Sequence, residues 1–355
     1  MNFKSLFATA ACALVASSAF AQPAQPQAPE YEFTVVKELP VTPVKNQYRS
    51  GTCWCFSTLS FIESEILRTK GIETDLSEMF VVSKSHHDRA IKYIRVDGHL
   101  NFAAGSSFGD VFHVISDYGI VPQAAMPGLQ YGTELPEQNE FDAVLKGYLD
   151  AVKRNPNRKL STAWVKGFDG IIAAYQGEYP ETFVVDGTTY TPESYRDYLG
   201  INSDDYVNLT SFTHHPFYEE FVLEVCDNWR WDTAYNIPID ELMQVMYNAI
   251  ENGYSIAWGS DVSEKGFTRN GVAVIPEENA KAGAGSDQER WVGKAAEQKE
   301  EVKTELPAEV IYTQEMRQDD FDRKTTTDDH GMHIYGLAKD QNGNDYFIVK
   351  NSWGE

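Results

Sequence analysis

A cysteine stands at the start of a helical pattern, in the run Asn46-Gln47-Tyr48-Arg49-Ser50-Gly51-Thr52-Cys53-Trp54-Cys55-Phe56-Ser57. Apolar residues then recur at spacings of three and four, at Phe56, Leu59, Ile62 and Ile66. This periodicity predicts a helix from Cys53 to Lys70, with Gly71 as its stop. A thiol reacts as its thiolate, and the unpaired N–H groups and dipole of a helix N-terminus stabilise that anion. Cys53 is therefore a candidate nucleophile.

A thiol nucleophile needs a base, and the chain offers eight histidines: His86, His87, His99, His113, His214, His215, His330 and His333. The sequence alone brings none of them to Cys53. We favour His330, because it precedes an apolar strand pattern and Asn351 follows about 20 residues later. An asparagine oxygen that accepts from one ring N–H would fix the tautomer of the imidazole. Gln47 could donate its amide N–H to a developing oxyanion.

Each of these residues also has an ordinary alternative role. Cys53 could be a small core residue, and Gln47 could be a solvated loop residue. His330 and His333 have a His-x-x-His spacing that could bind a metal, although a strand would place them on opposite faces and no further ligand is apparent. The remaining histidine doublets are predicted to be surface or loop residues: His86-His87 and His214-His215.

The N-terminal residues and the remaining cysteines give three further expectations. Residues 1–21 resemble a secretory signal, with Lys4, an apolar run and the cleavage-site pattern Ala19-Phe20-Ala21. A buried N-terminal helix or a lipoprotein signal that uses Cys12 are the alternatives. Removal of the signal leaves Cys53, Cys55 and Cys226, an odd number, so at least one thiol is unpaired. Cys55 and Cys226 could pair, but their apolar surroundings favour two buried thiols.

The net charge of −23 argues against a nucleic-acid partner and against docking on anionic lipid, since both require clustered Lys and Arg. No run after the signal is long and apolar enough to span a bilayer. We therefore expect an exported protein, periplasmic or secreted, without stable membrane insertion after signal removal.

The rest of the chain predicts a flexible Pro/Gln/Ala-rich linker at 22–39 and one domain at 40–355. Further helices are expected from Ser77 onward, at 109–118, at 141–152, after Pro192 and at 240–252. Strands are expected at 254–258, 334–338 and 346–350, the last two joined by an Asn-Gly turn. Residues 278–305 are predicted to be an exposed helix or a mobile loop.

Three motifs occur in a fixed order: Asn46-Gln47 with Ser50-Gly51-Thr52-Cys53-Trp54, then His330-Gly331-Met332, then Asn351-Ser352-Trp353-Gly354. With them the sequence resembles the papain-like cysteine peptidases, and most closely their bleomycin hydrolase and aminopeptidase C branch. The resemblance covers roughly residues 40–355. Cys53 and His330 are 277 residues apart, about twice the separation in the secreted papain type. The extra length resembles the helical insertions of that branch.

The resemblance implies an α+β papain-like fold with a helical lobe led by Cys53, a β-barrel lobe that carries His330 and Asn351, and a large insertion at roughly 125–325. It implies that Cys53 is the nucleophile, His330 the general acid/base, Asn351 the orienting residue and Gln47 the oxyanion donor. No metal or organic cofactor is needed for this chemistry.

The implied substrates are peptides trimmed from their N-terminus, and the implied assembly is the homo-hexamer of the branch. A cysteine endopeptidase of the same fold and a non-catalytic binding protein on this scaffold remain alternatives. The sequence stops at Glu355, directly after Asn-Ser-Trp-Gly, whereas members of the branch continue for several strands and end in an arm that favours free N-termini. We therefore expect a chain that lacks its C-terminal strands and arm.

Overall fold

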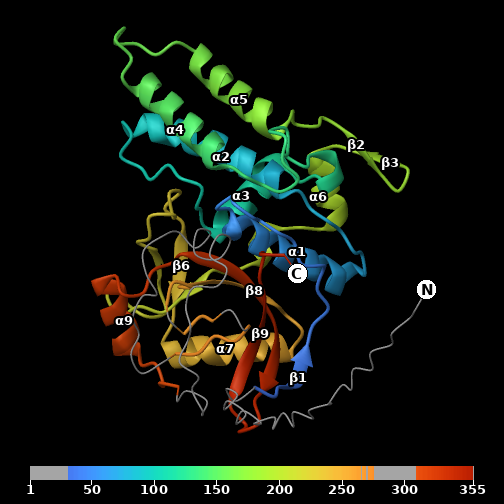
Figure 1. The fold of residues 1–355 in the computed structure, drawn as a ribbon, viewed down its shortest axis with the longest axis vertical. Coiled ribbons are helices and arrows are strands. Elements are labelled where there is room, and N and C mark those ends of the chain that lie inside the picture. The colour runs from blue at the N-terminus through green and yellow to red at the C-terminus, as the bar shows by residue number, and fades with distance from the viewer. Residues whose placement is uncertain (1–30, 265, 269–270, 276–308, 355) are drawn as a thin grey trace, which may run out of the picture.

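The computed structural model describes residues 31–264, 266–268, 271–275 and 309–354. Its helices are α1 Cys53–Lys70, α2 Glu78–Arg95, α3 Phe108–Tyr118, α4 Asn139–Lys153, α5 Ala163–Gln176, α6 Pro192–Leu199, α7 Ile239–Glu251 and α9 Gln314–Arg323. Its strands are β1 Thr34–Glu38, β2 Phe183–Val185, β3 Thr188–Tyr190, β4 Leu209–Thr210, β5 Glu220–Val222, β6 Thr233–Asn236, β7 Ile256–Ser260, β8 His330–Lys339 and β9 Asp345–Lys350. In Figure 1, α1 lies between the other N-terminal helices above it and the β7–β9 strands with α7 and α9 below it.

Helix α1 has the predicted bounds. It begins at Cys53 and ends where Gly71 adopts a left-handed φ of 66° and donates its N–H to the Leu67 carbonyl. A glycine tolerates this conformation at little cost, so the helix stops there. Arg68 and Lys70 occupy the last turn, where cations complement the helix dipole.

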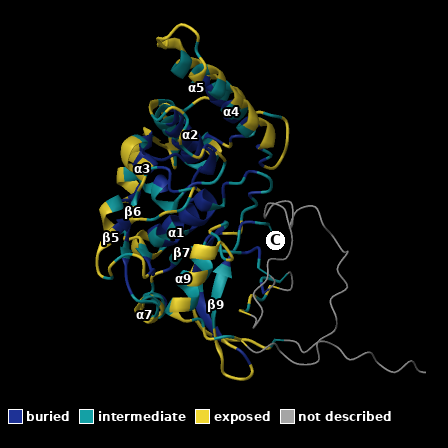
Figure 2. Cartoon of the chain, turned by 90° about the vertical axis from the view of Figure 1, so that its left-hand side faces the viewer, coloured by how far each residue is buried: buried dark blue, intermediate teal, exposed yellow. Residues whose placement is uncertain are grey.

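Two apolar cores hold the helical part together. In the first, α1 packs against α2 and α3, and α6 packs against α3, around the buried side chains Leu59, Ile62, Phe80 and Ile115. The second core joins α2 to α4 and α5. Buried residues concentrate along α1 and the inner face of α2, whereas the outer faces of α4 and α5 are exposed (Figure 2). Helix α1 is thus a rigid central element.

Strand β8 is the centre of an antiparallel four-stranded sheet. Its first half pairs with β7, its second half with β1, and β9 pairs along the opposite edge. Helix α1 packs along β8, and α7 contacts β7 and β8, with Ile250 of α7 in one core cluster with Ile334 and Leu337. The mixed helix-and-sheet architecture confirms the predicted α+β class. The described strands form an open sheet and not a closed barrel.

The structure differs from several expectations about the flanking segments. Residues 34–38, inside the predicted linker, form β1 and pair with β8. The predominantly helical region also contains the β2–β3 hairpin and a small sheet in the order β4-β6-β5. Cys226 is exposed instead of buried, while Cys55 is buried, and neither forms a disulfide. The buried-thiol prediction was therefore wrong for Cys226, which lies on a surface loop.

Two expectations fall outside the described residues: the signal peptide at 1–21 and the exposed segment predicted at 278–305. No helix in the described part of the chain is both long and apolar enough to cross a membrane. Strand β8 starts four residues earlier than predicted, at His330 itself, because its first residues pair with β7 and are covered by α1.

Candidate active site

Cys53 is the first residue of α1 and is partly accessible to solvent. The turn before it approaches residues 103–105 closely. Gly51 has a φ of +65°, and a Cβ added there would lie 2.7 Å from the Ala104 Cβ. The indole N–H of Trp54 donates to the Ala104 carbonyl oxygen at 3.0 Å. Glycine is required at position 51 both by its φ and by this contact, and together they fix the start of the helix.

The first residues of β8 lie against the start of α1. A Cβ added at Gly331 would lie 3.3 Å from the Cys53 carbonyl oxygen and 2.8 Å from Ser57 Oγ. Ser57 Oγ itself donates to the Cys53 carbonyl at 2.8 Å. A larger residue at 331 would push strand and helix apart, so Gly331 allows the strand that carries His330 to lie against the start of α1.

Asn351 is a hydrogen-bond partner of the His330 ring. His330 Nε2 is 2.8 Å from Asn351 Oδ1, and the Ser352 N–H also donates to that oxygen at 2.7 Å. Because Oδ1 accepts both bonds, Nε2 carries the proton and Nδ1 is left as the basic nitrogen. The ring of Trp353 covers His330, with centroids 4.8 Å apart.

Burial controls the charge of His330. The side chain is 2% exposed, and burial lowers the pKa of His330 to about 4, opposed by the hydrogen bond to Asn351. The imidazole is therefore neutral at pH 7 unless a negative charge lies next to it. A neutral imidazole can accept the proton of a thiol, and the resulting thiolate stabilises the imidazolium.

Gln47 is held by the same segment that holds His330. Its backbone N–H donates to the Ser352 carbonyl at 2.8 Å, and Ser352 Oγ donates to Gln47 Oε1 at 2.6 Å. With Oε1 occupied as an acceptor, the Nε2 amide is the free end, and no hydrogen bond among the described residues occupies it. The structure thus brings Cys53, His330, Asn351 and Gln47 to one region.

A buried charge network that the sequence did not reveal supports this region. Lys45 Nζ lies 2.7 Å from Glu78 Oε1 and 3.2 Å from Glu63 Oε1. Burial raises the pKa of Glu78 to about 7, and Lys45 opposes this shift. Lys350 donates to Ser60 Oγ at 2.8 Å. Through Lys45 and Lys350 the network ties the segments just before Gln47 and Asn351 to α1 and α2. Only the tertiary structure could show these contacts.

His333 takes no part in the site. It lies on the opposite face of β8 from His330, as the strand pattern predicted, with Nδ1 2.9 Å from Ser60 Oγ. Burial, and then the charge of Lys350, lowers the pKa of His333 to about 3. The two histidines therefore do not share a metal ion.

Phe108 and Asp328 border the site next to His330. A Cβ at Gly259 would lie 3.0 Å from Asp328 Oδ1 and 3.4 Å from the Phe108 ring, and a Cβ at Gly331 would lie 2.9 Å from the same ring. Both glycines therefore leave room for Phe108. The motifs gave no signal for these two wall residues, because each depends on a contact between distant segments.

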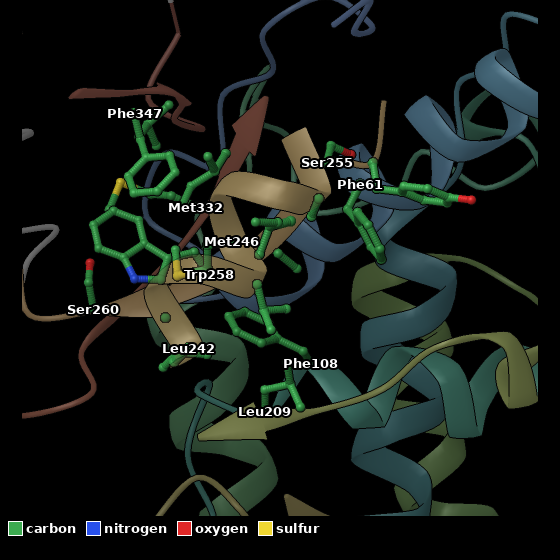
Figure 3. A pocket seen from close by; sticks show the side chains of 18 of the residues that line it. Phe61, Phe108, Leu209, Leu242, Met246, Ser255, Trp258, Ser260, Met332 and Phe347 are labelled. Atoms are coloured by element: carbon green, nitrogen blue, oxygen red, sulfur yellow. The ribbon is translucent and has the colours of Figure 1, made fainter. Parts of the chain in front are cut away.

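A large cavity of about 2310 Å³ opens next to these residues, and Asn351 and Trp353 are part of its lining. Figure 3 shows apolar side chains from α7, from the sheet strands and from α3 around it: Leu242, Met246, Trp258, Met332, Phe347 and Phe108. An extended apolar chain could lie there, next to the orienting residue of the site.

Comparison with known proteins identifies the class to which this fold and site correspond. Residues 29–141 match the papain family of cysteine proteases. The structure resembles that of PepW from Lactobacillus rhamnosis HN001, with a TM-score of 0.64 and 19% identity over 91% of this chain and 76% of that one. The resemblance to papain-like cysteine peptidases is thereby confirmed, and the fold is papain-like.

Curated relatives narrow the class further. The chain is 25% identical over 266 residues to aminopeptidase G of Lactobacillus delbrueckii subsp. lactis, a match that covers 63% of this chain and 60% of that protein. It is 26% identical over 270 residues to aminopeptidase E of Lactobacillus helveticus, with the same two coverages. The chain therefore spans about 60% of the length of these relatives. They support the predicted aminopeptidase branch.

Replacing Gln47 with alanine should lower kcat by roughly 10²- to 10³-fold with little change in KM, because one oxyanion donor would be lost. Steady-state kinetics on a fluorogenic peptide measure the effect. Ser352→Ala is the graded control: it frees Gln47 Oε1 but keeps the amide, so its loss should be smaller. Equal activity of Gln47→Ala and the unmodified enzyme would contradict the assigned role.

Proposed function

We propose that this protein is a cysteine peptidase that hydrolyses peptides through an acyl-enzyme on Cys53, and that it acts as an aminopeptidase. The observation that carries the proposal is the hydrogen bond from His330 Nε2 to Asn351 Oδ1, beside the start of α1. It leaves the basic ring nitrogen for the Cys53 thiol.

The reaction follows from these positions. His330 Nδ1 takes the thiol proton, and the Cys53 sulfur attacks the substrate carbonyl carbon. The Gln47 amide and the Cys53 backbone N–H, which lies outside the helical ladder, stabilise the oxyanion. The C–N bond then breaks as His330 gives its proton to the departing amine. Water, deprotonated by the same ring, attacks the thioester, and the thiol leaves with the proton.

Two observations support action at a free N-terminus. The first is the similarity to aminopeptidases G and E. The second is the negative charge of Asp328, two residues before His330. The surrounding protein, and then the negative charges of Asp227 and Asp261, raise the pKa of Asp328 to about 6. Asp328 is nevertheless open to solvent. A cationic ammonium group placed there would relieve the repulsion among these carboxylates.

The test compares a fluorogenic aminoacyl substrate with its N-acetylated form. We expect the free form to be hydrolysed at least about tenfold faster in kcat/KM, a difference of about 1.4 kcal/mol. Faster cleavage of the blocked form would indicate an endopeptidase. Absence of hydrolysis together with absence of iodoacetamide labelling at Cys53 would indicate a binding protein.

We also propose that the protein is exported, since residues 1–21 carry the signal pattern, and that it assembles as a homo-hexamer like the branch it resembles. Expression as the full chain, followed by N-terminal sequencing of the mature protein and by its mass in solution, tests both proposals. An intact Met1 would argue against the first, and a monomer against the second.

A further inference from the structure

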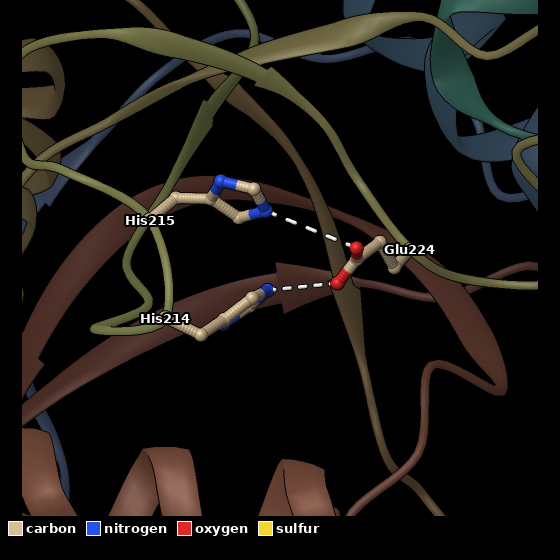
Figure 4. A group of neighbouring side chains, drawn as sticks. All are labelled: His214, His215 and Glu224. Carbon is tan, nitrogen blue, oxygen red and sulfur yellow. Dashed lines mark hydrogen bonds and ion pairs between the residues drawn. The ribbon is translucent and has the colours of Figure 1, made fainter.

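Two consecutive histidines converge on one glutamate in the small β4–β6–β5 sheet, away from the catalytic residues. His214 and His215 lie in the loop between β4 and β5, and Glu224 lies just after β5 (Figure 4). His214 Nε2 is 2.9 Å from Glu224 Oε2, and His215 Nε2 is 3.8 Å from Glu224 Oε1. All three potential ligand atoms lie within 4.8 Å of one another.

Aromatic neighbours hold both imidazole rings. The His214 ring stacks on Phe321 of α9, with centroids 5.7 Å apart and planes at 15°. The His215 ring stacks on Phe221 of β5, at 4.2 Å and 18°. Two rings held in this way approach a common point with little rotamer freedom left to lose on binding.

The Gln318 side chain contacts His214 on the ring edge that faces away from Glu224. His214 Nδ1 lies 3.1 Å from Gln318 Nε2 and 3.3 Å from Gln318 Oε1 of α9. The backbone N–H of Thr213 donates to the same oxygen at 2.7 Å, which identifies that atom as an acceptor. Without a metal ion, Nε2 donates its hydrogen to Glu224 Oε2 at 2.9 Å, so a metal ion would take the place of that proton. Metal-binding histidines are typically oriented by such a partner on the other ring nitrogen.

We propose that His214, His215 and Glu224 bind one divalent transition-metal ion of the zinc class. Two imidazole nitrogens and one carboxylate suit Zn²⁺, with water as the fourth ligand. Ligands at about 2.1 Å in a tetrahedral arrangement lie about 3.4 Å apart, so the side chains need to move by only about 1 Å. The high negative charge of the chain also favours cation binding.

The metal has a structural role, distinct from the metal-independent hydrolysis at Cys53. It joins both ends of β5, since His215 precedes that strand and Glu224 follows it. Through Gln318, which contacts His214, it also fixes α9. A second contact between α9 and this loop is the 2.7 Å hydrogen bond from Arg317 to the Ser211 carbonyl. Six residues after α9, the chain enters β8 at His330.

The test uses the full chain with Cys53→Ala and Cys226→Ser, so that no accessible thiol competes for the metal. After treatment with a chelator, calorimetric titration with ZnCl₂ should give one equivalent bound with micromolar affinity. Glu224→Gln, which keeps the shape of an exposed side chain, should weaken binding at least about 100-fold, and His214→Asn should do the same. Zinc should raise the melting temperature of the parent only.

His113→Gln is the matched control. His113 pairs with Asp232 at 2.9 Å on the surface, without a third ligand, so its loss should leave zinc binding unchanged. Absence of heat and of any melting shift at millimolar zinc would show that the cluster is an ion pair only and would overturn the proposal. Binding that survives both Glu224→Gln and His214→Asn would overturn it as well.

Discussion

Cys53→Ala is expected to lower kcat by about 10⁴-fold or more, to the level left by substrate binding and oxyanion stabilisation alone. In the proposed mechanism the sulfur forms the covalent bond of the acyl-enzyme. No other thiol in the described part of the chain can replace it, because Cys55 is buried and Cys226 lies elsewhere on the surface. Single-turnover and steady-state kinetics on an aminoacyl substrate measure the loss. Peptide mapping by mass spectrometry after iodoacetamide treatment should find the label on Cys53 of the unmodified protein, and in the variant only on the exposed Cys226.

Two cysteine variants serve as controls for this result. Cys226→Ser alters an exposed thiol and should leave kcat unchanged. Cys55→Ser replaces a buried thiol whose sulfur lies 3.5 Å from the Glu78 carbonyl oxygen, a contact that a hydroxyl can keep. It should retain most activity, with at most a modest loss of stability. Hydrolysis that survives Cys53→Ala but disappears in Cys55→Ser would transfer the nucleophile to Cys55.

His330→Ala is expected to lower kcat by about 10³-fold or more, because the same ring both activates the thiol and protonates the departing amine. The thiolate that remains would depend on the helix N-terminus alone. Activity should then rise steeply with pH, as hydroxide replaces the lost base, whereas the unmodified enzyme should show a plateau. A pH series of kcat/KM distinguishes the two.

His333→Gln is the matched control for this variant. It alters a histidine three residues further along the same strand, on the opposite face, where Ser60 is its hydrogen-bond partner. We expect a lower melting temperature and a nearly unchanged kcat for the folded fraction. A collapse of kcat in His333→Gln without loss of fold, together with an active His330→Ala, would show that the wrong histidine was chosen.

The proposed catalytic residues could be selected from the sequence because each lies in a short contiguous motif. The start of α1 followed from its apolar spacing, and the His330–Asn351 pair followed from its resemblance to a known pattern. Sequence could not derive the choice among eight histidines physically. That choice depends on β8 packing against α1, and the contact requires glycine at position 331.

Other features were missed for a common reason: their partners are far apart in sequence. Lys45 reaches Glu63 and Glu78 on two different helices, so no local pattern could indicate a buried charge network. His214-His215 was predicted to be a loop doublet, and only the turn into β5 brings Glu224 back to it. Cys226 follows the apolar strand β5, yet it lies outside that strand on an exposed loop.

One short segment, Asn351-Ser352-Trp353, contacts both His330 and Gln47. The proposed proton-transfer group and oxyanion donor are thereby positioned by the same segment, although His330 belongs to the sheet and Gln47 precedes the helical part. A relative motion of the two halves of the molecule would have to break the Gln47–Ser352 hydrogen bonds before it could change the distance between His330 and Gln47. The spacing of these two proposed catalytic groups is therefore set locally, by one segment, and not by the packing of the whole molecule.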